Sequence, residues 1–149
     1  MSALEFLAST LRASGLELTE HPEQQAVSFG HRSEVGDWEV FCRIRSPYSQ
    51  IVIYSIHPYA TPEHTRGTMS ELLTRANYGL VIGNFELDLE DGEVRFKTSL
   101  DFSGDRLSGA LIAMLLQHNL EGFARYRPAV DAVMTGGTNL QLLLDRVEV

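Results

Sequence analysis

Alternating apolar and polar positions predict a central β-hairpin in this chain. Residues 38–45 place apolar side chains at every second position, which is typical of a strand with one buried face. Residues 50–56 are rich in β-branched side chains and predict the partner strand. The segment 46–49 contains Pro47 and is typical of a turn, so residue 45 would lie opposite residue 50. A further short strand is predicted over residues 25–29.

A second hairpin is predicted over residues 84–100. Apolar and charged residues alternate on both sides of Asp91-Gly92, a dipeptide that favours a two-residue turn because glycine can adopt a positive φ. Such a turn would place Glu86 opposite Lys97. This pairing brings opposite charges together across the strands, which supports the register.

Helical periodicity and capping residues predict three helices. The first covers 3–14 and begins with Ser2-Ala3-Leu4-Glu5, a capping box. The second runs from Thr61 to Gly79, where the glycine ends it. The third is long, 107–134, and Pro128 should kink it or split it in two. The tail, 138–149, is compatible with helix or strand.

In chain order these elements are α-β-β-β-α-β-β-α, followed by the tail. Because strands outnumber helices and mostly join by hairpins, the sequence predicts an α+β fold. We expect an antiparallel twisted sheet of about five strands with helices packed on it. A length of 149 residues is typical of one domain, so a single domain over 1–149 is expected.

Charge and cysteine content narrow the possible partners and the compartment. The formal net charge of −8 argues against direct nucleic-acid binding and against binding to an anionic membrane. Cys42 is the only cysteine, so no intrachain disulfide can form, and a reducing compartment fits best. No apolar run has the length of a membrane span, and the N-terminus does not resemble a signal peptide. We therefore expect a cytoplasmic protein.

The sequence predicts no catalytic residue, no cofactor-binding residue and no metal site. The five histidines lack the spacing of paired metal ligands, and we interpret them as surface or loop residues. Cys42 shares the apolar face of its strand and is expected in the core. The acidic residues of the second hairpin alternate outward, whereas a general acid–base pair needs carboxylates that converge.

The central hairpin is apolar on both faces, and this is the one feature that suggests a binding site. One face carries Trp38 and Ile53, which helices can cover. The second face needs its own cover, and Arg43 would lie at its rim. The apolar residues of this second face are Phe41, Val52, Tyr54 and Ile56. We predict that they form a homodimer interface or a partner site, although cover from within the same chain is an open alternative.

The segment 75–100, which contains NYGLVIGNFELDLEDGEV, resembles the YbjN family of bacterial proteins regarded as sensory transduction regulators. The segments 115–120, 126–129 and 133–137 are similar to the long helix of that family. The resemblance implies a fold like that of type III secretion chaperones, which often pair as dimers. It also implies a link to stress responses and regulation, with no catalytic residue and no cofactor.

These observations together favour a non-enzymatic protein-binding module, either a chaperone-like protein or a regulatory adaptor. Its partner would be a protein, and a homodimer is expected. One alternative is a small-molecule binder or enzyme with a pocket between the sheet and the long helix. A further alternative is a secretion chaperone for an exported effector.

Overall fold

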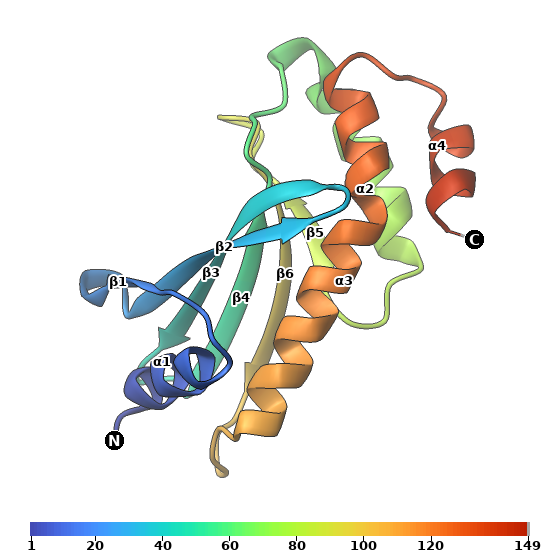
Figure 1. Cartoon of the computed structure of the whole chain (residues 1–149). Helices are drawn as coiled ribbons and strands as arrows, with labels where there is room; N and C mark the ends of the chain where they lie inside the picture. The colour runs from blue at the N-terminus through green and yellow to red at the C-terminus, as the bar shows by residue number, and fades with distance from the viewer. Residues whose placement is uncertain (149) are drawn as a thin grey trace.

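Six antiparallel strands form one sheet, in which neighbours follow the order β1-β2-β3-β4-β6-β5 (Figure 1). The sheet belongs to a computed structural model that describes residues 1–148. The α+β class and the antiparallel sheet confirm the fold predicted from the sequence, and β1 is the strand that the prediction missed. The strands are β1 (Thr19–His21), β2 (Ala26–Ser33), β3 (Gly36–Arg45), β4 (Gln50–Ile56), β5 (Asn84–Leu87) and β6 (Val94–Asp101).

Helices α1, α2 and α3 bury side chains against one face of the sheet, and α4 packs on α3 (Figure 1). Ser2 caps α1, since its Oγ accepts a hydrogen bond of 3.1 Å from the Glu5 backbone N–H, as the capping box predicts. Within residues 1–148, none of the helices combines the length and apolar character needed to cross a bilayer. The helices are α1 (Ala3–Ala13), α2 (Arg66–Tyr78), α3 (Gly109–Met134) and α4 (Leu140–Val147), with short 3-10 helices η1 (Pro22–Gln24) and η2 (Glu63–Thr65).

A buried polar cluster fixes α3 across the sheet. The side-chain amide of Asn119 donates to the carbonyl oxygen of Ile53 at 2.8 Å, and its Oδ1 accepts from the Ser55 hydroxyl at 2.6 Å. Ser55 Oγ also accepts from Trp38 Nε1 at 2.9 Å. Because Asn119 is fully buried, each bond replaces one that water would make in the unfolded chain. These directional bonds therefore set the position of α3 over β3 and β4.

The register of the central hairpin is confirmed. Arg45 lies opposite Gln50, and residue 41 lies opposite residue 54. Cys42 is fully buried on the helix-covered face, which confirms its predicted place in the core. Burial raises the pKa of the Cys42 thiol to about 12, so the reactive thiolate is disfavoured.

The second hairpin forms, but its predicted turn and register are wrong. Glu86 lies opposite Arg95, two positions from the expected Lys97, and residues 88–93 form a loop longer than a two-residue turn. The Gly92 carbonyl oxygen accepts a 2.7 Å hydrogen bond from the backbone N–H of Thr61, and Gly92 keeps a positive φ of 84°. This contact with a distant segment decides the loop conformation, and local turn preference cannot reveal it.

Other element boundaries also differ from the prediction. The helix expected from Thr61 begins as α2 at Arg66, because η2 precedes it and the Thr61 backbone is bonded to the 88–93 loop. Helix α3 runs through Pro128 without splitting, because buried side chains on both sides of the proline hold it against its neighbours. The tail contains α4, and Val149 lies outside the described residues.

Candidate protein interface

Among residues 1–148, α1, α2 and α3 all pack on one face of the sheet and leave the other face without an α-helix (Figure 1). We call this second face the open face. Side chains at alternate positions of the paired strands point to it, since strand side chains alternate between faces. Its main residues are Asp37, Glu39, Phe41, Arg43 and Arg45 of β3, Gln50, Val52, Tyr54 and Ile56 of β4, and Arg95, Lys97, Ser99 and Asp101 of β6.

The structure brings all five sequence-predicted site residues together on the open face. Phe41 lies opposite Tyr54, and Arg43 lies opposite Val52. Ile56 follows Tyr54 by two positions along β4 and lies opposite Glu39. Phe41, Tyr54 and Ile56 are partly exposed and Arg43 is exposed, whereas Val52 is buried. Their role in binding stays a prediction.

Side chains of neighbouring strands cover part of the aromatic surface. The Arg95 guanidinium carbon lies 4.1 Å from the centre of the Tyr54 ring, in a cation–π contact. On the other side, the His21 ring centre lies 5.3 Å from that of Phe41, and His21 Nε2 is hydrogen-bonded to Ser28 Oγ at 2.8 Å. The free chain thus shields some of this apolar surface without a helix.

Glu86 holds the two basic residues of β6 in place. Arg95 Nε lies 2.8 Å from Glu86 Oε1, and Lys97 Nζ lies 3.0 Å from Glu86 Oε2. Burial raises the pKa of Glu86, but the hydrogen bonds from Lys97 and Arg95 outweigh this effect and hold the pKa below its usual value. Glu86 therefore stays ionised at neutral pH and orients Arg95 over Tyr54.

Two hollows of opposite character flank the aromatic centre of the open face. One, of about 770 Å³, lies toward the β2–β3 hairpin and is lined by Asp37, Glu39 and Glu93, with Arg32. The other, of about 250 Å³, lies at the opposite end, where Arg45 and Lys97 contribute basic groups and Asp101 contributes one carboxylate. The face is therefore acidic at one end and more basic at the other.

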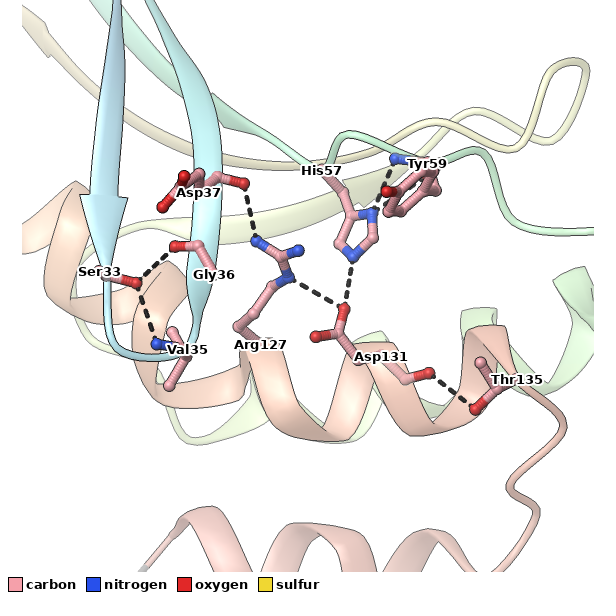
Figure 2. A network of polar contacts seen from close by, with 9 residues as sticks. All are labelled: Ser33, Val35, Gly36, Asp37, His57, Tyr59, Arg127, Asp131 and Thr135. Atoms are coloured by element: carbon pink, nitrogen blue, oxygen red, sulfur yellow. Dashed lines mark hydrogen bonds and ion pairs between the residues drawn. The ribbon is translucent and has the colours of Figure 1, made fainter.

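A buried histidine, His57, joins the end of β4 to α3 (Figure 2). It lies in the loop after β4, so the interpretation of the histidines as surface or loop residues holds for its place in the chain but misses its burial. His57 Nε2 lies 2.7 Å from Asp131 Oδ1, and Nδ1 accepts a 3.1 Å hydrogen bond from the Tyr59 backbone N–H. Burial lowers the pKa of His57, and nearby Arg127 lowers it further, whereas the bond to Asp131 opposes both. The sequence could not reveal this burial, because Asp131 is 74 residues away.

Arg127 extends this cluster to the β2–β3 hairpin (Figure 2). Its Nε donates to Asp131 Oδ1 at 2.9 Å, and its NH1 donates to the Asp37 backbone carbonyl at 3.2 Å. The ring of His57 is enclosed, with a side-chain exposure of 1%. The cluster therefore positions the hairpin and α3, and the imidazole is shielded from solvent. Within residues 1–148, His, Cys, Asp and Glu side chains form no group of three that could hold a metal ion.

An exposed apolar loop between α2 and β5 is a feature that sequence reasoning missed. Tyr78, the last residue of α2, is 95% exposed, and Val81 in the loop is 92% exposed. Gly83 holds the end of the loop close to the sheet, because a Cβ there would lie 2.6 Å from the Phe96 ring. The sequence pattern around Gly79 indicated only a helix end, and nothing in it indicated that the apolar residues after it face solvent.

Comparison with known proteins matches this chain to one protein family and to one solved structure of similar fold. The YbjN family model, described as "Putative bacterial sensory transduction regulator", matches residues 3–132, so α4 lies beyond the matched region. A solved structure of similar fold is the "Crystal structure of YbjN, a putative transcription regulator from E. coli". The two share 13% sequence identity at a TM-score of 0.65, over 83% of this chain and 86% of that chain. None of the curated proteins matches this chain.

Proposed function

The chain belongs to the YbjN family, and from this premise we propose that it is a regulatory protein that acts by binding another protein through the open face. In this proposal it is an adaptor or chaperone-like protein of a bacterial stress or signalling response, and it catalyses no reaction. It works in the cytoplasm, where its single cysteine stays reduced.

One observation carries the proposal: the open face presents partly exposed aromatic residues on paired strands. Phe41 and Tyr54 lie opposite each other near the middle of the sheet. Aromatic residues at the centre of a surface, surrounded by charged residues, are typical of protein interfaces. Strands hold such anchors more rigidly than loops do, so little conformational entropy is lost on binding.

The titratable groups of the interior favour binding over catalysis. The imidazole of His57 is enclosed and already bonded on both nitrogens. The thiol of Cys42 is fully buried, and burial raises its pKa. A general base or a nucleophile must reach its substrate, and neither group is accessible.

Site-specific photo-crosslinking in cells tests this proposal. A photoreactive phenylalanine analogue replaces Tyr54 on the open face or, in the control, the exposed Tyr78 at the end of α2. We expect protein adducts from position 54, and we expect the Phe41→Asp change to remove them while circular dichroism stays unchanged. Because Phe41 is partly exposed, a carboxylate there stays solvated in the free chain but is buried without a partner in the complex. Adducts from position 78 alone would refute the proposal.

A further inference from the structure

Strand β2 is left without a neighbour on one side over more than half of its length. It spans Ala26–Ser33, but β1 pairs only with residues 26–28, and the β2–β3 hairpin extends past β1 (Figure 1). Residues 29–33 pair with β3 on one side and with no strand of residues 1–148 on the other. We call this stretch the free edge. At about 3.3 Å per residue it is roughly 16 Å long, enough for a further short strand.

The register shows which backbone groups of the free edge point outward. The carbonyl oxygen of Gln25, one residue before β2, accepts a 3.0 Å hydrogen bond from the backbone N–H of Ile44 in β3. Because the bonding side alternates along an antiparallel strand, every second residue counted from Gln25 bonds to β3, and the residues between them point away from it. Gly30 and Arg32 point away, and β1 does not extend far enough to reach them. Within residues 1–148, their N–H and carbonyl groups therefore have no main-chain partner.

The opposite edge of the sheet is closed by a side chain. The last strand there is β5, and Asn77 of α2 contacts the outward backbone groups of Phe85. Asn77 Nδ2 donates to the Phe85 carbonyl oxygen at 3.1 Å, and Asn77 Oδ1 accepts from the Phe85 N–H at 2.7 Å. The side-chain amide thus takes the place of a neighbouring strand and protects this edge from unwanted pairing. The free edge of β2 has no comparable cover in the described part of the chain.

Gly30 leaves space beside a carboxylate that has no basic partner. On the open face, Glu39 of β3 lies opposite Gly30. Glu39 Oε2 lies 3.9 Å from the position that a Cβ on Gly30 would occupy, so the carboxylate leans toward the free edge. Glu39 forms no ion pair with any of residues 1–148. Both residues line the hollow of about 770 Å³, to which Asp37 and Glu93 add two further carboxylates. A cationic side chain on a strand beside β2 can therefore reach Glu39 across Gly30.

We propose that the free edge binds an extended segment of a partner protein as an added strand, antiparallel to β2, with an arginine or lysine opposite Gly30. This inference rests on the proposed protein-binding function and adds the way in which the partner is held. The strand pairs of this sheet are all antiparallel. Opposite Gly30 and Arg32, the segment exchanges main-chain hydrogen bonds that supply affinity. The basic side chain at Glu39 supplies selectivity, and the charge of Arg32 disfavours a second basic residue opposite it.

Amide exchange measured by NMR on the full chain tests the added strand. In the free protein, the N–H groups of Gly30 and Arg32 should exchange quickly, whereas those of Phe29 and His31, which point to β3, should exchange slowly. The probe is a seven-residue peptide of threonine and valine around a central arginine. It should slow exchange at Gly30 and Arg32 at least about tenfold. The control is the same peptide with every backbone nitrogen methylated, which should give no protection because it cannot donate main-chain hydrogen bonds.

Exchanging the central charge tests the role of Glu39. A peptide with glutamate in place of the arginine should bind the wild-type chain at least about fivefold more weakly. Glu39→Gln should reduce this preference to below about twofold, whereas Glu121→Gln, an exposed change on α3, should leave it unchanged. Gly30→Val should weaken binding of the arginine peptide, because its side chain fills the space above the strand. Gly30 does not have a positive φ, so valine can adopt its backbone conformation.

Three results would overturn the inference: slow exchange at Gly30 and Arg32 without peptide, unchanged exchange at millimolar peptide, or equal binding of the arginine and glutamate peptides. The first result would mean that another part of the chain or a second copy already occupies the edge. The crosslinking test separates these failures from a failure of the proposed function. Adducts from position 54 together with any of the three results would keep the open face as a protein site and exclude the free edge. Peptide binding at the edge without adducts from position 54 would do the reverse.

Discussion

A single methyl group at Gly92 should destabilise the fold, because this residue combines a positive φ with a close backbone contact. Its φ is 84°, and a Cβ at this position would lie 2.3 Å from the Thr61 carbonyl oxygen and 2.9 Å from Arg66 Nε. Thr61 belongs to the segment before α2 and cannot move freely, because its backbone N–H donates to the Gly92 carbonyl oxygen at 2.7 Å. Gly92→Ala must therefore shift the loop away from α2.

The expected cost is the sum of two effects. The left-handed backbone conformation costs an alanine about 1–2 kcal/mol relative to glycine. Moving the loop also weakens the hydrogen bond between Thr61 and Gly92 and the 3.0 Å bond from Arg66 Nε to the Thr61 carbonyl. Each such bond contributes about 0.5–1.5 kcal/mol. The free energy of unfolding should fall by roughly 2–4 kcal/mol in total.

Urea unfolding followed by circular dichroism measures this loss, and Gly104→Ala is the matched control. Gly104 also has a positive φ, 78°, but no atom lies within 4 Å of a Cβ built on it. The control should therefore lose only the backbone contribution, about 1–2 kcal/mol. If both variants lose the same free energy of unfolding, the contact with Thr61 is not the reason for the glycine. If neither variant loses stability, the positive φ does not require a glycine either.

Two further predictions concern the buried polar groups. Asn119→Leu should lower the free energy of unfolding by roughly 2–4 kcal/mol, because it leaves buried partners such as the Ile53 carbonyl unsatisfied. The control Gln117→Leu, at an exposed position of the same helix, should change this free energy little. Equal effects of the two changes in urea unfolding would contradict the role of the cluster. For His57, burial lowers the folded-state pKa below the unfolded value of about 6.5. The unfolded state therefore binds the proton more readily than the folded state does. The free energy of unfolding should fall as the pH drops from about 6.5 through the folded-state pKa. His57→Gln should flatten this loss in melting temperatures measured between about pH 7 and pH 5.5, and an unchanged slope would contradict it.

Local patterns predict those parts of the fold whose register is set within a few residues. The β3–β4 hairpin follows from alternation and a short turn, and its pairing of Arg45 with Gln50 agrees with the prediction. The β5–β6 hairpin has equally clear alternation, but its loop is bonded to Thr61 and Arg66. A contact between segments far apart in sequence overrides the turn preference of Asp91-Gly92, and the register shifts by two positions so that each side chain keeps its face.

The candidate interface could be predicted in part for the same reason. Period-two alternation places Phe41 and Tyr54 on the face opposite Trp38, and the structure has them there. Their partial cover by His21 and Arg95 depends on which strands lie beside the hairpin, and that order is a property of the whole sheet. The burial of His57 likewise depends on α3, which follows it by many residues.

Net charge gives the open face a particular role in an acidic chain. With a formal charge of −8, two copies repel each other at most relative orientations, which disfavours non-specific association. Arg43, Arg45, Arg95 and Lys97 are four of the 12 basic residues, and they share the open face. Asp37, Glu39 and Asp101 share this face too, so its charge is close to neutral, and repulsion of an acidic protein is weaker there than the net charge alone implies. Charges around Phe41 and Tyr54 would therefore guide the orientation of a protein partner on this face more than they add to its affinity.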